Sequence, residues 1–271
     1  MSPAEAAPAA PRLPLPAADG IGDRVLFDPS RPLYVTHLAP PAERLTLAVV
    51  SIRRLRALTP AQLDGMTGRH FTASEDAYAR SLPAPRRRYD WLAGRLALKH
   101  AVAAHQRRYR GIALEPPEVG VRTVTRGIQA GKPVVDAPLE VGLSHAGDFA
   151  VAVCGPHAIG VDLEYDRRIP PLLAQLLAAD HDPAAVSPDA RRLRAMPLAL
   201  RWACKEAVLK HYGFGLRVDA REVALTGWRP DGGFTWRPGG GLLRHAPAAD
   251  TRPPAGWARR LQGHFLALVW T

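Results

Sequence analysis

The sequence predicts an α+β protein built from two similar halves. Its 271 residues, 47% of them hydrophobic, are enough for a sizeable core. Short apolar runs typical of strands alternate with two strongly periodic helical segments. The second segment, WACKEAVLKH from Trp202, repeats the pattern of the first, WLAGRLALKH from Trp91, at an offset of 111 residues. Two shorter stretches match at the same offset, so we interpret the chain as an internal duplication.

The first 43 residues are expected to form an N-terminal extension. Residues 1–20 contain twelve Ala or Pro and cannot bury enough surface to offset the entropy of ordering, so part of the extension should be disordered. The N-terminal half, 44–155, begins with the apolar run RLTLAVVSI, which predicts a strand over 44–52. A helix over about 87–105 follows from apolar residues at helical spacing, namely Leu92, Leu96, Ala97, Ala101 and Ala104.

Each remaining element is predicted from its local pattern. Strands are expected at 111–119 and 141–155, with the loop QAGKPVVD between them. The C-terminal half, 156–271, should open with the strand AIGVDLE and a helical stretch broken by prolines. A second helix over about 197–211 should end at Gly213 and Gly215, residues typical of a C-terminal cap. The rest predicts strands within 221–230, 232–238 and 259–270.

Composition narrows the functional classes. Lys and Arg outnumber Asp and Glu by 36 to 25, and the resulting charge of +11 indicates a surface that attracts anions. The arginines are spread along the chain without interleaved aromatic residues, so nucleic-acid binding remains an alternative rather than the first choice. The longest apolar runs are too short for a membrane helix. With no secretory leader and two cysteines in unrelated contexts, a cytoplasmic protein without membrane attachment is expected.

An acidic pair stands out in the strand that opens the C-terminal half. Asp162 and Glu164 are two residues apart, so a strand would project both carboxylates to the same face. On the second helix, Glu206 and Lys210 share one stripe with Trp202. A solvated strand face and an ordinary surface ion pair are the simpler explanations. Together, however, the three carboxylates are enough to hold a hard cation such as Mg²⁺.

Groups suited to phosphate lie nearby in the sequence. The stretch LSHAGDF places Ser144 and His145 at a turn or strand start, where a hydroxyl and an imidazole could meet a phosphate. The tripeptide GKP offers Lys132 from a loop that Pro133 stiffens. Neither motif is specific alone. No Walker A sequence and no dinucleotide-binding glycine fingerprint lies between a strand and a helix, which disfavours an ordinary ATPase or dehydrogenase.

The ordered set of motifs resembles a known family. GVDLE, then WACKEAVLK and GFGLRV, preceded by RRYDWLAGRLALKHAV, GKP and LSHAGDFAVAV, looks like the signature of 4′-phosphopantetheinyl transferases, most closely the two-lobed Sfp (surfactin-activator) type. The resemblance covers about residues 45–270. It implies a pseudo-dimer of two α+β halves with the active site between them, and a monomer of the holo-(acyl-carrier-protein) synthase type. The activity implied is transfer of the phosphopantetheine arm of coenzyme A to a serine of an apo acyl or peptidyl carrier protein, releasing adenosine 3′,5′-bisphosphate, in fatty-acid, polyketide or nonribosomal-peptide synthesis.

The resemblance also implies roles for individual residues. Asp162, Glu164 and Glu206 match the ligands of Mg²⁺ or Mn²⁺, and Glu206 also matches the residue that activates the serine. Lys210 matches the lysine at the pyrophosphate. The further candidates for binding coenzyme A are Lys132, Pro133, Ser144, His145, Lys205, Arg88 and Arg95, together with Asp162. The first-lobe basic residues of relatives are replaced by ASEDAYAR, so Arg80 or the run 86–88 would have to substitute. The main alternative is a catalytically idle module that binds coenzyme A or a carrier protein.

Overall fold

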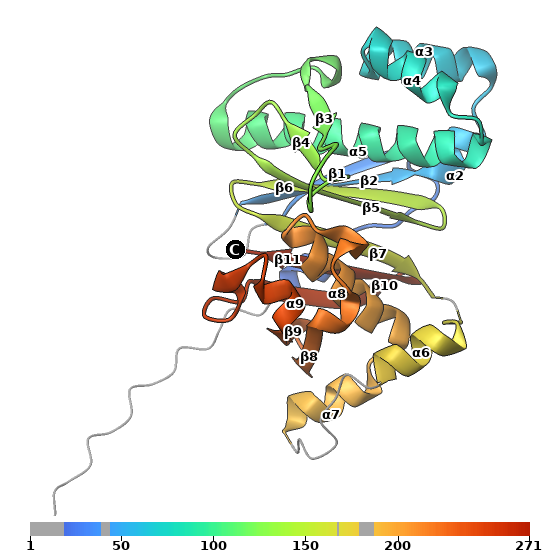
Figure 1. Ribbon diagram of the computed structural model, residues 1–271. Helices are drawn as coiled ribbons and strands as arrows, with labels where there is room; N and C mark the ends of the chain where they lie inside the picture. Colours follow the sequence, from blue (N-terminus) through green and yellow to red (C-terminus); the bar gives the residue numbers. More distant parts are fainter. Residues whose placement is uncertain (1–18, 39–43, 167, 179–186) are drawn as a thin grey trace, which may run out of the picture.

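The two halves of the computed structural model form four layers (Figure 1). The structure describes residues 19–38, 44–166, 168–178 and 187–271. A sheet with the order β1-β2-β6-β5 packs face to face on a second sheet with the order β7-β11-β10-β9-β8. Helix α5 covers the outer face of the first sheet, and α8 covers the outer face of the second. The α+β prediction is confirmed.

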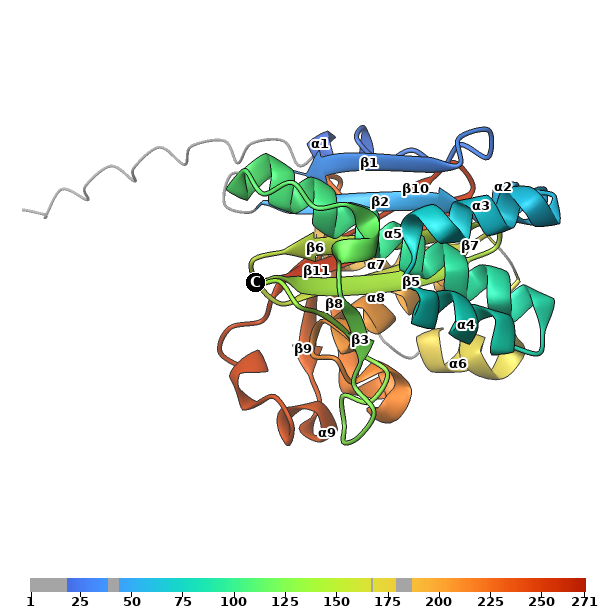
Figure 2. The same ribbon diagram turned by 90° about the horizontal axis from the view of Figure 1, so that it is seen from above.

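The first half contains α1 Asp19–Gly22, four further α-helices, of which α5 is central, and six strands. Their bounds are β1 Leu33–Leu38, β2 Leu45–Ser51, α2 Ile52–Arg56, α3 Pro60–His70, α4 Ala73–Ser81, α5 Pro85–Arg110, η1 Pro116–Glu118, β3 Val121–Thr123, β4 Pro133–Val135, β5 Glu140–Ala146 and β6 Phe149–Gly155. In Figures 1 and 2, α3 and α4 lie over α5 on the side away from the sheets.

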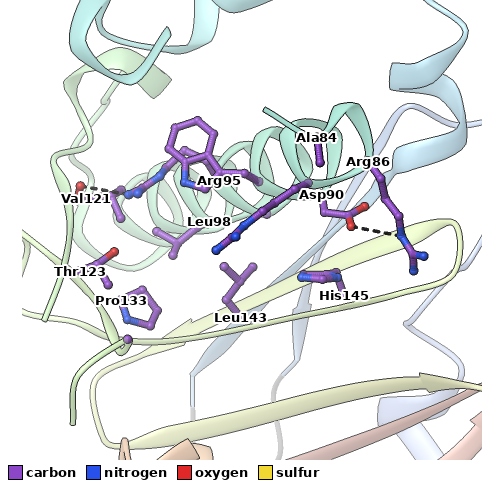
Figure 3. A pocket seen from close by; sticks show the side chains of 14 residues that line it. Ala84, Arg86, Asp90, Arg95, Leu98, Val121, Thr123, Pro133, Leu143 and His145 are labelled. Carbon is purple, nitrogen blue, oxygen red and sulfur yellow. Dashed lines mark hydrogen bonds and ion pairs between the residues drawn. The ribbon is translucent and has the colours of Figure 1, made fainter. Parts of the chain in front are cut away.

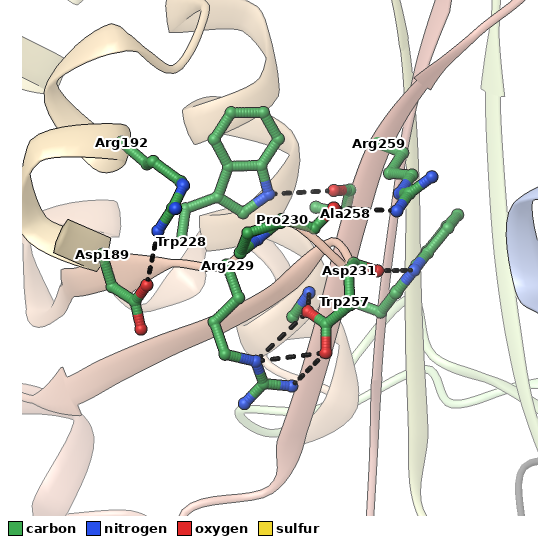
Figure 4. A network of polar contacts seen from close by, with 10 residues as sticks. Asp189, Arg192, Trp228, Arg229, Pro230, Asp231, Trp257, Ala258 and Arg259 are labelled. Atoms are coloured by element: carbon green, nitrogen blue, oxygen red, sulfur yellow. Dashed lines mark hydrogen bonds and ion pairs between the residues drawn. The ribbon is translucent and has the colours of Figure 1, made fainter. Parts of the chain in front are cut away.

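The second half is arranged around α8. Its elements are β7 Ile159–Tyr165, α6 Pro171–Ala178, α7 Pro188–Ala195, α8 Leu198–His211, η2 Gly215–Arg217, η3 Ala220–Glu222, β8 Val223–Trp228, β9 Gly233–Pro238, α9 Gly240–Leu243, η4 Pro247–Ala249, β10 Ala255–Leu261 and β11 His264–Trp270. The turn between β8 and β9 is held to the sheet by Asp231, whose carboxylate pairs with Arg229 at 3.1 Å and whose carbonyl accepts a hydrogen bond from the Trp257 indole at 3.1 Å (Figure 4).

Both predicted long helices are present, but α5 covers Pro85–Arg110 and so ends five residues beyond its predicted end at about residue 105. Proline at the first position of α5 is compatible with a helix start, because the first N–H groups have no intrahelical partner. The helix stops at Gly111, whose φ of 67° lies in the left-handed region that glycine enters at little cost. Helix α8 covers Leu198–His211, against a prediction of about 197–211, and Gly213 beyond it has a φ of 76°.

Two sequence-based expectations about the elements are wrong, and two helices were not predicted. Residues 111–119 contain a short 3₁₀ helix and no strand, because two consecutive prolines remove the N–H groups that a ladder needs. The run 259–270 is interrupted by a turn at Gln262 and Gly263, both with positive φ, which separates β10 from β11. Helices α3 and α4 were not predicted, although Thr59 and Thr72 each begin a capping box that marks a helix start.

The N-terminal extension is shorter than predicted. Strand β1 pairs with β2 along its whole length and forms an edge of the first sheet. Ile21, Val25 and Phe27 are buried in the core between the two sheets, and the Phe27 ring stacks on His264 of the second half. Residues 19–38 are therefore part of the fold, and they contact both halves. The predicted disorder within 1–20 concerns residues that lie almost entirely outside the described ranges.

The two halves share a strand order that agrees with the predicted duplication. In each half a first strand pairs with the last one, which pairs with the strand before it: β2-β6-β5 and β7-β11-β10. Each central helix also has one fully buried lysine whose ammonium group donates hydrogen bonds to a 3₁₀ turn later in the same half. Lys99 Nζ donates to two carbonyl oxygens at 3.0 and 2.9 Å in and beside η1, and Lys205 Nζ donates to two at 2.9 and 2.5 Å in and beside η3.

This correspondence corrects the register of the repeat. An ungapped offset of 111 aligns Lys99 with Lys210, whereas the structure gives Lys99 the same role as Lys205. It also aligns Arg53 with Glu164, but Arg53 lies in helix α2 and not in a strand. Loops of different length separate the elements of the two halves, so one fixed offset cannot match them all.

No helix among the described residues is both long and apolar enough to span a membrane.

Candidate functional site

The predicted acidic and basic residues meet where β5, β7 and α8 come together. Strand β5 is at one edge of the first sheet, and β7 is at one edge of the second. Gly160 allows α8 to pack directly on β7, because a Cβ there would overlap the Ala207 carbonyl and lie 2.5 Å from the His211 nitrogen. This close packing brings the side chain of Asp162, on β7, within reach of Lys210, on α8.

Asp162 is the buried centre of this site. Its side chain is 3% exposed, and Oδ1 accepts hydrogen bonds from Lys210 Nζ at 2.5 Å and from the Ser144 hydroxyl at 2.8 Å. The other oxygen, Oδ2, is buried and has no hydrogen-bond partner among the described residues. An unpartnered carboxylate oxygen in a buried position is costly unless a further positive group binds it. Asp162 therefore has one oxygen fixed by protein contacts and one available to a ligand.

Glu206 lies one helical turn before Lys210, with 3.3 Å between Oε2 and Nζ. Burial, reinforced by the negative charge of Asp162 and less strongly by that of Glu164, raises the pKa of Glu206 to about 7. Although burial opposes its charge, Asp162 and Glu206 hold the pKa of Lys210 above the usual value for lysine. The predicted carboxylates are thus close enough to influence one another.

These residues fit a cation, but they are not arranged as a ready-made metal site. Within the described ranges, no three His, Cys, Asp or Glu side chains converge closely enough to hold a metal ion. Instead, the ammonium group of Lys210 bridges Asp162 and Glu206. The free Oδ2 of Asp162 and the raised pKa of Glu206 both indicate an excess of negative charge that a divalent cation would relieve.

A pocket of about 520 Å³ lies beside this group, between α5 and β5 (Figure 3). Its basic side chains are Arg86, Arg87 and Arg95, and His145 faces it from β5. Arg95 is anchored through a 3.0 Å hydrogen bond to the Val121 carbonyl, and burial lowers the pKa of its guanidinium. His145 is solvent-exposed, but partial desolvation by the groups around its ring lowers its pKa, which favours the neutral imidazole.

A smaller pocket, of about 200 Å³, connects the first one to the acidic group. Lys132 and Arg217 line it together with Lys210, and it shares Pro133 and Leu143 with the larger pocket. Lys132 donates to Glu140 at 2.7 Å. Because the two pockets share lining residues, we describe them together as one trough, which is lined by more basic than acidic side chains and therefore suits an extended polyanion.

Four predicted coenzyme-binding residues line neither pocket, namely Ser144, Asp162, Lys205 and Arg88. Lys205 is fully buried and donates to two backbone carbonyls in and beside η3, so the structure does not bring it to either pocket. Arg88 is absent from the lining of both pockets, and its Nε is buried without a partner, so Arg86 and Arg87 take the place expected of it. Arg80 also fails as a substitute, because Asp76 and Asp64 already pair with it at 2.8 Å each.

Several residues that line the two pockets were not predicted from the sequence. Arg217 belongs to the quoted stretch GFGLRV but was given no role, and Trp91 was read only as part of the repeat. Asp90, which pairs with Arg56 at 3.3 Å, is the acidic member of the larger pocket. Asp90 and Trp91 lie four residues after Arg86 and Arg87, and residues four apart on a helix share a face, so this spacing indicates that they belong to the same pocket.

The raised pKa of Glu206 predicts a pH-dependent stability for the metal-free protein. Because the folded state favours the protonated carboxyl, this contribution is complete below about pH 4.5 and is lost as the pH rises through 7. We expect wild-type protein to lose about 3 kcal/mol more unfolding free energy between pH 5 and pH 8 than Glu206→Gln does. Urea unfolding of both proteins in a chelator measures this difference, and parallel pH profiles would contradict the raised pKa.

Comparison with known proteins assigns the region that contains the acidic group. Residues 158–245 match the family model described as the 4′-phosphopantetheinyl transferase superfamily. These residues are a domain of that superfamily. The domain contributes Asp162, Glu164, Glu206 and Lys210, whereas most of the large basic pocket comes from residues that precede it. The resemblance to the superfamily is confirmed, and its Sfp-type subdivision stays a prediction.

Solved structures with similar folds include two holo-(acyl-carrier-protein) synthases. One, from Bacillus anthracis in complex with CoA (3′,5′-ADP), is 25% identical, with a TM-score of 0.33 over 41% of this chain and 92% of its own. The other, from Neisseria meningitidis, is 19% identical, with a TM-score of 0.33 over 41% of this chain and 94% of its own. Among curated protein sequences, no match is found.

Proposed function

We propose that the protein is a Mg²⁺-dependent 4′-phosphopantetheinyl transferase. It would move the phosphopantetheine arm of coenzyme A to a serine of an apo carrier protein and release adenosine 3′,5′-bisphosphate. One observation carries the proposal: the buried acidic group of the superfamily domain adjoins a basic trough through Lys210, which belongs to both. A phosphoryl-transfer enzyme needs this juxtaposition of a cation site with an anion site.

The metal would be held by Asp162, Glu164 and Glu206. Their carboxylate oxygens suit a hard cation, and Oδ2 of Asp162 has no other partner among the described residues. When bound, the ion would neutralise charge on the diphosphate of the substrate and on the leaving group. Replacement of the lysine contact by a metal would also bring the pKa of Glu206 back toward its ordinary value, since an adjacent cation favours the ionised carboxylate.

Lys210 and Glu206 would act on the reacting atoms. The serine oxygen of the carrier protein forms a bond to the β-phosphorus of coenzyme A, and the bond from that phosphorus to the bridging oxygen breaks. Glu206 would accept the serine proton, directly or through water, and Lys210, which contacts Glu206 and lines the smaller pocket, would stabilise the negative charge on the leaving bisphosphate. Lys210 keeps its charge at neutral pH because its pKa is raised.

The basic trough would hold the nucleotide part of coenzyme A. Arg86, Arg87 and His145 offer donors to phosphate in the larger pocket, and Lys132 and Arg217 do so in the smaller one. Trp91 adds a flat apolar surface against which an adenine ring can pack. We further propose a monomeric cytoplasmic enzyme whose basic surface attracts acidic carrier proteins.

Intact-mass analysis tests the function. The purified protein is incubated with coenzyme A, Mg²⁺ and apo carrier proteins from fatty-acid, polyketide and nonribosomal-peptide synthesis. We expect at least one carrier to gain the mass of one phosphopantetheine arm, and its serine-to-alanine variant to gain nothing. Addition of a chelator should stop the reaction. Binding of coenzyme A without any mass gain across the panel would instead support the idle binding module and refute the transferase.

A further inference from the structure

Ser144 and His145 are adjacent in β5, yet they serve different parts of the site. Successive side chains on a strand point to opposite faces. His145 is exposed and lines the larger basic pocket, whereas Ser144 is 6% exposed and lines neither pocket. The two residues were expected to bind one phosphate together. Because successive side chains of β5 point to opposite faces, the two residues cannot bind one phosphate together, and Ser144 must have a different role.

The hydroxyl group of Ser144 is fully used by protein contacts. It donates to Asp162 Oδ1 at 2.8 Å and accepts from the Leu163 backbone nitrogen at 3.2 Å and from Lys210 Nζ at 3.1 Å. A serine hydroxyl has one proton to donate and two lone pairs. All three positions are therefore occupied, and none is left for a phosphate oxygen.

These contacts fix the orientation of Asp162 from the other half of the protein. Ser144 belongs to the first sheet, while Asp162 and Leu163 belong to the second. Both donors to the carboxylate, the Ser144 hydroxyl and Lys210, bind Oδ1, and Oδ2 is left buried without a hydrogen-bond partner. A carboxylate held through one oxygen presents the other in a fixed direction, which is how partners of metal ligands tune a metal site.

We propose that Ser144 is a positioning residue that holds Asp162 with Oδ2 directed to the divalent cation, and that it does not bind the phosphates of coenzyme A. This inference rests on the proposed function, because it takes Asp162 as a metal ligand. It explains why a site whose carboxylates all come from the second half needs the first half as well. Of the two adjacent residues, only His145 is then assigned to the basic pocket.

Two binding measurements on the unloaded protein test the proposal. The first is the affinity for Mn²⁺ in the absence of coenzyme A, followed by the EPR signal of the free ion. The second is the affinity for adenosine 3′,5′-bisphosphate in a chelator, followed by calorimetry. For Ser144→Ala we expect Mn²⁺ to bind about 10- to 100-fold more weakly. Binding of the bisphosphate should stay within about threefold of wild type, because no donor to phosphate is removed.

Matched variants separate positioning from general damage. Ser144→Thr keeps a hydroxyl and should retain most of the Mn²⁺ affinity. Ser51→Ala removes another buried hydroxyl, the N-cap of α2 on the same sheet, and should lower stability without changing either affinity. If Ser144→Ala does not fold, Ser144→Cys fills the same space with a weak donor and should show the same selective loss of Mn²⁺.

The outcomes are distinguishable. Wild-type Mn²⁺ affinity in Ser144→Ala would overturn the positioning role while leaving the transferase intact. A loss of bisphosphate affinity with normal Mn²⁺ affinity would make Ser144 a phosphate ligand and would also overturn it. If the wild-type protein binds no Mn²⁺, both this inference and the metal site of the proposed function fail.

Discussion

Alanine in place of Asp162 should abolish transfer to the carrier protein. The variant loses the buried carboxylate at the centre of the site, including the oxygen left free for a cation. We expect a fall in the transfer rate of at least about 1,000-fold, equivalent to about 4 kcal/mol of transition-state stabilisation. The protein should remain folded, because Lys210 keeps its contact with Glu206 at 3.3 Å. Initial rates by intact mass and thermal unfolding measure the two effects.

A carboxylate just beyond the same strand provides the control. Asp166 follows the end of β7, is half exposed and pairs with Arg260 at 2.7 Å. Asp166→Ala should change the transfer rate less than about twofold, since a surface ion pair contributes little. A transfer rate for Asp162→Ala within tenfold of wild type would refute the assignment of the metal site.

Substitution of Gly160, a residue with no side chain to take part in catalysis, should have the second largest effect on stability and transfer. In Gly160→Ala the new Cβ would overlap the Ala207 carbonyl and lie 2.5 Å from the His211 nitrogen, and both belong to the backbone of α8. Backbone cannot rotate away as a side chain can, so the helix must move from β7. We expect a loss of about 3 kcal/mol in unfolding free energy. Transfer should fall as well, because Lys210 and Glu206 move away from Asp162.

The matched control replaces a glycine that has room. Gly68 lies in α3, and a Cβ there meets no atom within 4 Å. Gly68→Ala should leave transfer unchanged and should raise stability by up to about 1 kcal/mol, because alanine favours the helix. Urea unfolding and transfer rates of the two variants give the comparison. Equal stability of Gly160→Ala and wild type would show that α8 is not held by close contact with β7.

The parts of the candidate site that could be predicted from the sequence are those that depend on the spacing of residues within one strand or one helix. The i, i+2 spacing on a strand and the i, i+4 spacing on a helix correctly placed Asp162 with Glu164, and Glu206 with Lys210. Lys205 was predicted to bind the coenzyme, but it lies one residue before Glu206, which is about 100° around the helix axis, and its side chain is fully buried. No property of the local sequence distinguishes a lysine that binds a ligand from one that donates hydrogen bonds to backbone carbonyl oxygens in the interior.

Local sequence patterns were sufficient to predict the two long helices, most of the strands, the acidic residues of the site and the superfamily of the C-terminal region. Local periodicity and short motifs are sufficient for those, because they depend on residues close together in the chain. The tertiary structure decided which side of β5 each residue serves, and it included residues 19–38 in the fold. It also decided that Arg86 and Arg87, not Arg88, face the pocket. Those outcomes depend on how two sheets and two helices pack, and packing brings together groups that are distant in sequence.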